Sequence, residues 1–135
     1  MRSRLTYLLL IPVAFMLMGA RSAPLVDPAP VPVPAGMAVK DVSKAIRAGV
    51  VLRGWVVSKD DGSKIDAVLN NRDHTVNIAI AYDATQVKVS YVSSDKMLYT
   101  EKNGTRYIHK KYMAWASNVA NDISRELQAA AIKKE

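Results

Sequence analysis

The fold of this chain is decided by the sequence TVNIAIAY, which occupies residues 75–82. Large apolar side chains stand at every second position, with small or polar side chains between them. A period of two is typical of a β-strand that buries one face and exposes the other. The pattern therefore predicts a strand whose Val76, Ile78, Ile80 and Tyr82 side chains point into a hydrophobic core.

Three other segments carry strand patterns, at residues 55–58, 64–70 and 86–92. Polar turn sequences separate the strands, among them DDG at residues 60–62 and DAT at residues 83–85. Aspartate bonds nearby backbone amides and glycine tolerates positive φ, so both favour tight turns. Since tight turns join strands that are neighbours in a sheet, the order predicts a four-stranded antiparallel meander.

An amphipathic helix is predicted on each side of the meander. Residues 39–53 carry apolar side chains at spacings of three and four, and Gly54 is a helix stop. We expect Thr105 to cap the second helix and His109 to lie in its first turn. The apolar stripe of that helix consists of Ile108, Tyr112, Trp115, Val119, Ile123 and Leu127. Residues 129–135 are expected to fray.

The fold class that follows is α+β: a helix, a four-stranded antiparallel meander and a helix. Both helices are expected on one face of the sheet, because the apolar face must be covered. Trp55 and Trp115 are expected in the core. This single domain spans residues 37–128, and the five prolines within residues 23–36 predict an extended linker that acts as a tether. A docking peptide for a proline-binding groove is the alternative.

Residues 1–22 have the layout of a secretory signal peptide, with two early arginines, an apolar run and small residues. The apolar run of residues 5–18 is shorter than the about 20 residues of a membrane-spanning helix. We expect cleavage between Ser22 and Ala23 and export to the periplasm. An uncleaved interfacial anchor is the alternative.

The chain contains no cysteine, which excludes disulfides, thiolate metal sites and thiol catalysis. Residues 17–20 read LMGA and are similar to a bacterial lipobox in which Ala20 replaces the lipidated cysteine. This site therefore cannot be acylated. Three interpretations remain: a soluble periplasmic protein, a copy that has lost the anchor of its relatives, or an engineered change.

The formal net charge is +7, but the basic residues are spread along the chain. A nucleic-acid partner is not predicted, because such proteins cluster their positive charge on one face. Solvated helix faces explain most of the charge, and attraction to an anionic membrane or cell-wall polymer is the alternative.

The two histidines, His74 and His109, are the candidates for chemistry, but the chain has no zinc, nucleophile-elbow or P-loop motif. We therefore predict no metal and no cofactor, and we interpret both histidines as hydrogen-bonded structural residues. Five tyrosines lie in residues 82–112 and are expected to seal the edge between the sheet and the last helix. A binding surface for a peptide or glycan is the alternative.

Four segments resemble a family of small, uncharacterised lipoproteins of Gram-negative bacteria: RDH at 72–74, IAIAY at 78–82, YVSSDKMLY at 91–99 and IHKKYMAW at 108–115, followed by Asn118. The resemblance covers residues 37–127 and departs from the family at Met113, where asparagine is usual, and at Ala20. It implies a location in the cell envelope, associated with the outer membrane in relatives that keep the lipidated cysteine. It also implies a shared binding site made of Arg72, His74, Ser94, Tyr99, His109, Tyr112 and Asn118.

The sequence thus favours a non-enzymatic periplasmic or envelope domain that binds a protein or a cell-wall component. One alternative is a small hydrolase that uses His74 or His109. Another is a membrane-associated factor in envelope assembly or stress. No pattern in the sequence indicates an oligomeric state.

Overall fold

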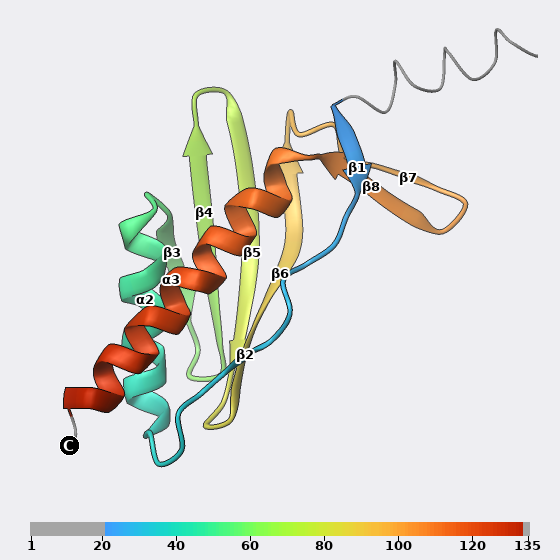
Figure 1. Ribbon diagram of the computed structural model, residues 1–135. Helices are drawn as coiled ribbons and strands as arrows, with labels where there is room; N and C mark the ends of the chain where they lie inside the picture. The colour runs from blue at the N-terminus through green and yellow to red at the C-terminus, as the bar shows by residue number, and fades with distance from the viewer. Residues whose placement is uncertain (1–20, 134–135) are drawn as a thin grey trace, which may run out of the picture.

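A computed structural model describes residues 21–133 and shows an α+β protein with two antiparallel sheets (Figure 1). The elements within these residues are β1 (Ser22–Pro24), β2 (Val31–Pro32), α2 (Val39–Leu52), β3 (Val56–Asp60), β4 (Lys64–Asn71), β5 (His74–Tyr82), β6 (Gln86–Asp95), β7 (Thr100–Lys102), β8 (Thr105–His109) and α3 (Lys111–Lys133). The predicted signal peptide lies almost entirely outside the described residues.

The larger sheet has five strands in the order β2-β6-β5-β4-β3. Its last four strands are the predicted meander, and their register places Ile80 between Ile65 and Val89. The prediction of a single four-stranded sheet was nevertheless wrong. The short strand β2 extends the sheet beside β6, and β1, β8 and β7 form a second sheet of three strands.

One face of the larger sheet is buried and the other faces solvent. All four apolar side chains predicted for the inner face of β5 are buried, at most 6% exposed. The neighbouring strands bury Ile65 and Val89 on the same face, whereas Asn77 and Lys88 on the opposite face remain partly or fully exposed. Both helices cover the apolar face, as predicted: α2 contacts β3 and β5, and α3 crosses the strands diagonally (Figure 1).

The two helices approach each other closely at Gly49. A Cβ atom added there would lie 2.9 Å from both the Cγ1 and the backbone nitrogen of Ile123. Glycine therefore allows the helix backbones to come together at this crossing. The predicted start of α2 is confirmed, and Ala38 provides no side-chain cap.

The second sheet corrects the prediction for residues 105–109. Thr105 begins strand β8 instead of capping a helix, and His109 is the last residue of that strand. The sequence Asn103-Gly104 forms the loop of a β-hairpin, with φ of 52° and 79°. Two successive positive φ values define the type I′ turn that Asn-Gly favours, and this local signal overrides the helical spacing of Ile108.

The proline-rich residues 23–36 pack on the domain, which differs from the expected free tether. β1 pairs with β8, β2 pairs with β6, and Val31 and Val33 are buried. The backbone N–H of Val33 donates to the Thr85 carbonyl at 3.0 Å. Prolines tolerate this position because it is the edge of the sheet, where one side of the strand needs no ladder bond.

The C-terminal helix also extends further than predicted. α3 continues to Lys133, and Ala130 and Ala131 pack partly buried against the core, so residues 129–133 do not fray. Packing against α2 supplies the stabilisation that sequence propensity alone did not indicate. No helix within residues 21–133 has the length and apolar character required to cross a bilayer.

Candidate binding site

The two histidines hold one unusual loop between β6 and β7. His74 Nδ1 lies 2.8 Å from the Lys96 carbonyl oxygen, and the His109 backbone N–H donates to the Met97 carbonyl at 2.7 Å. Lys96 and Leu98 have φ of 59° and 58°, so two non-glycine residues in the left-handed region flank the buried Met97. Because a carbonyl only accepts hydrogen bonds, the proton of His74 resides on Nδ1.

His109 acts as a cap for α3. Its Nδ1 accepts the backbone N–H of Lys111 at 3.1 Å, so this nitrogen is unprotonated. Burial lowers the pKa of His109, and the nearby positive charge of Lys111 lowers it further. The imidazole therefore stays neutral as a structural acceptor at the start of the helix.

A tyrosine cluster lies between β6 and α3. The ring of Tyr91 stacks on Tyr99 with centroids 5.0 Å apart and meets Tyr112 edge-on at 5.4 Å. The Tyr91 and Ser94 hydroxyl groups are hydrogen-bonded at 2.7 Å. The buried Tyr112 hydroxyl donates to Asp27 Oδ1 at 2.7 Å, and burial strongly raises the pKa of Tyr112. This cluster joins the proline-rich segment to the core.

A cavity of about 280 Å³ opens beside the N-terminal half of α3, where the helix passes over the end of β4. Its lining residues are Arg53, Trp55, Leu69, Asn71, Trp115 and Asn118. Trp55 is 2% exposed, which confirms its predicted place in the core. Trp115 is only partly buried, so its predicted place in the core was wrong. Part of the indole is exposed, although Tyr112, Ala116 and Val119 on the same helix are fully buried.

The polar side chains of this cavity differ in whether they already have a hydrogen-bond partner. Arg53 Nε donates to Asp122 Oδ2 at 2.6 Å, and this hydrogen bond raises the pKa of Arg53. The Arg53 side chain is nevertheless 44% exposed, so part of its guanidinium faces outward. The side-chain amides of Asn71 and Asn118 make no hydrogen bond to other residues within the described part of the chain.

The predicted site residues fall into separate groups. His74 and His109 meet at the loop, whereas Ser94, Tyr99 and Tyr112 surround Tyr91, and Asn118 lines the cavity. Arg72 is exposed in the turn between β4 and β5, with φ of 59°, and makes no hydrogen bond or ion pair within residues 21–133.

Sequence reasoning missed Arg53 and Asn71 as site residues, and it assigned both tryptophans of the cavity to the core. One signal was present, since Trp115, Asn118 and the Arg53 partner Asp122 follow at spacings of three and four along one helix face.

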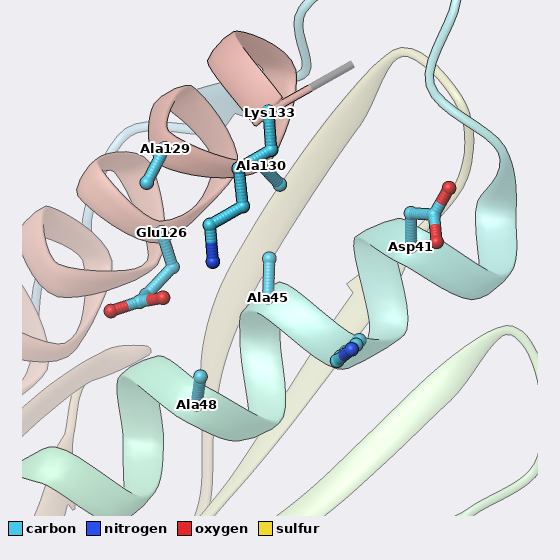
Figure 2. A pocket seen from close by; sticks show the side chains of 8 residues that line it. Asp41, Ala45, Ala48, Glu126, Ala129, Ala130 and Lys133 are labelled. Atoms are coloured by element: carbon cyan, nitrogen blue, oxygen red, sulfur yellow. The ribbon is translucent and has the colours of Figure 1, made fainter.

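Two other cavities are less suited to a specific ligand. Figure 2 shows a groove between α2 and α3 that is floored by alanines of both helices, with the Lys133 side chain extending over it. Its charged residues are two acidic and two basic: Asp41, Lys44, Glu126 and Lys133. Another cavity of about 320 Å³ lies between residues 28–32 and α3. No aromatic ring lines either of them.

The side chains considered for catalysis do not line these cavities. The Ser94 hydroxyl is bonded to Tyr91 instead of a histidine, and neither histidine lines any of the three cavities described above. Within residues 21–133, no three histidine, aspartate or glutamate side chains converge as a metal site would require.

Comparison of the chain with protein-family profiles, curated proteins and solved structures found no match. The structure itself defines the class: a small α+β protein with a five-stranded antiparallel sheet covered on one face by two helices.

Proposed function

We propose that this protein is a non-enzymatic domain of the bacterial cell envelope that binds a cell-wall glycan in the Trp115 cavity. The observation that carries the proposal is the partly exposed indole of Trp115, which lines the cavity together with Asn71 and Asn118. An indole presents a flat apolar face, and a sugar ring offers a matching face of C–H groups. The amides supply donors and acceptors for hydroxyl and acetamido groups.

The presence of Arg53 favours a glycan ligand that carries a carboxylate. Its guanidinium has five N–H groups, and the bonds to Asp122 use only two of them. The Asp122 side chain is 8% exposed, and its Oδ1 also lies 3.6 Å from Arg125 Nη1. These contacts hold the Arg53–Asp122 pair in place. A fixed guanidinium with free N–H groups at a cavity rim suits recognition of a planar anion.

The envelope location is supported by the sequence of residues 1–22 and by the resemblance to envelope lipoproteins. The hydrolase alternative receives less support, because neither histidine lines any of the three cavities described above. A catalytic histidine would need a free nitrogen directed at a substrate position.

Binding to purified cell-wall sacculi and to soluble wall fragments tests the proposal. We expect the wild-type chain to sediment with sacculi, and Trp115→Ala and Asn118→Ala to reduce the affinity by about tenfold each. Ile132→Ala is the matched control, because Ile132 lies on the same helix and is 69% exposed, far from the cavity. Circular dichroism verifies that each variant is folded.

The proposal is wrong if the wild-type chain does not bind sacculi or fragments. It is also wrong if the two cavity variants bind as tightly as Ile132→Ala. Capture of an envelope protein through the same side chains, with sacculi left unbound, would assign the cavity to a protein partner instead.

A further inference from the structure

The second sheet and its preceding loop carry most of the net positive charge of residues 21–133. We call this region the arm and define it as residues 21–24 and 95–111. The arm contains six basic and two acidic residues, whereas the remainder of residues 21–133 contains ten basic and nine acidic residues. Figure 1 shows the β7–β8 hairpin projecting from the end of the main sheet where the chain enters at β1. The charge is thus concentrated on a projecting element.

Apolar side chains are exposed beside these charges. Leu98 is 51% exposed and Tyr99 is 41% exposed, both in the loop that leads into β7. Leu98 adopts the left-handed conformation, which costs a non-glycine residue free energy. The hydrogen bonds from His74 and His109 hold the preceding residues of this loop in place. An exposed leucine at a strained position contributes little to the fold, so its placement suggests contact with a partner.

We propose that the arm is a docking surface for an anionic phospholipid bilayer. Basic side chains attract the headgroups, and the exposed apolar side chains of Leu98 and Tyr99 enter the interface. The sequence that precedes the arm is consistent with a membrane beside it. In the uncleaved alternative, the apolar run of residues 5–18 ends three residues before Arg21, so a membrane holding that run would lie within about 10 Å of the arm.

This surface is separate from the Trp115 cavity and does not depend on the proposed glycan. Lys102, Arg106 and Lys110 are exposed and would remain on the arm after cleavage at Ser22. Lys96 is less suited to a test, because its Nζ lies 3.7 Å from Asp73. The test therefore changes the first three residues.

Vesicle co-sedimentation of the full-length chain tests the proposal. We expect tighter binding to vesicles that contain phosphatidylglycerol than to pure phosphatidylcholine, and a loss of the difference at high salt. Each basic residue near an anionic surface strengthens binding about fivefold, so the triple variant Lys102→Gln, Arg106→Gln, Lys110→Gln should weaken it by about 100-fold. The matched control is the triple variant Lys40→Gln, Lys59→Gln, Lys88→Gln, which removes three exposed charges elsewhere. All variants share residues 1–20, so any contribution of that segment is constant.

A second variant separates docking from folding. In Leu98→Gly the strain is relieved, because glycine adopts positive φ without penalty, and the exposed side chain is lost. We expect a higher thermal midpoint together with about fivefold weaker binding to the anionic vesicles. Two results would overturn the proposal. In the first, the arm triple variant binds the anionic vesicles as tightly as the wild type; in the second, the control triple variant loses as much affinity as the arm triple variant. Charge-dependent binding to isolated sacculi, with vesicles left unbound, would overturn it in favour of a wall polymer.

Discussion

The two halves of helix α3 share one apolar spacing in the sequence but have different surroundings. The C-terminal half packs against α2, where Gly49 and Ile123 are in contact and Leu127 is fully buried. The N-terminal half passes over the polar end of the sheet, where Trp115 and Asn118 line a cavity. The comparison shows that one periodic pattern can pack one end of a helix against its neighbour and line a cavity at the other end.

The same contrast separates the two tryptophans of the cavity. Trp55 lies in the wall shared with the core, whereas Trp115 stands at the opening. We expect Trp55→Ala to lower the free energy of unfolding by about 3–5 kcal/mol, because it empties a buried site. Trp115→Ala should cost only about 1–2 kcal/mol, because part of the ring is already in water. Urea denaturation measures both, and equal losses would contradict the distinction between the two halves.

The next largest effect on the free energy of unfolding is expected at the crossing of α2 and α3. Gly49→Ala places a methyl group against the backbone of Ile123, so we expect a loss of about 1–3 kcal/mol despite the better helix propensity of alanine. Lys40→Ala, at an exposed position of the same helix, is the control. Thermal unfolding of both proteins is the measurement. A stabilised Gly49→Ala protein would show that the crossing is looser than described.

A smaller effect on stability is expected in the tyrosine cluster, beside the N-terminal half of α3. Tyr112→Phe removes the hydroxyl that donates to the partly buried Asp27 Oδ1, which still accepts from the Tyr91 backbone N–H, and the loss should cost about 1–2 kcal/mol. The proline-rich segment should also be released more often, so limited proteolysis within residues 23–36 should become faster. Tyr99→Phe is the control, because no hydrogen bond of the Tyr99 hydroxyl is present in the described part of the chain. Unchanged proteolysis would argue against anchoring by Asp27.

The histidine cap gives the smallest effect, and it depends on pH. Because the folded pKa of His109 lies below its ordinary value of 6.5, the unfolded chain takes up the proton first as the pH falls. The stability that neutral His109 provides is therefore present above pH 6.5 and is lost as the pH falls through the folded pKa. His109→Asn keeps a capping acceptor without a titrating group, so its unfolding midpoint should vary less between about pH 7.5 and 5.5. Equal pH dependence in both proteins would remove His109 from this role.

The alternating strands and the first helix were predictable because their signals are local. Residues 75–82 repeat with a period of two, and the aspartates of the turns bond amides two or three residues away. The β7–β8 hairpin could also have been predicted from Asn103-Gly104, but the helical spacing of Ile108 and Tyr112 obscured it. The spacing was coincidental, because Ile108 is buried from a strand and Tyr112 from a helix.

The candidate site was much less predictable. Its lining residues come from α2, β3, β4 and α3 or the segments beside them, and no local pattern relates Arg53 to Asn118. His74 and His109 do meet at one loop, but their roles there are structural.

The sequence by itself determined the meander, the first helix and the inner face of the sheet, because short-range periodicity and turn chemistry act within a few residues. Only the tertiary structure decided that the proline-rich segment pairs with both sheets, that Trp115 lines a cavity and that the net positive charge is highest on one projecting arm. Each of these depends on contacts between segments far apart in the chain, and the packing that selects such contacts leaves no periodic signal in the sequence.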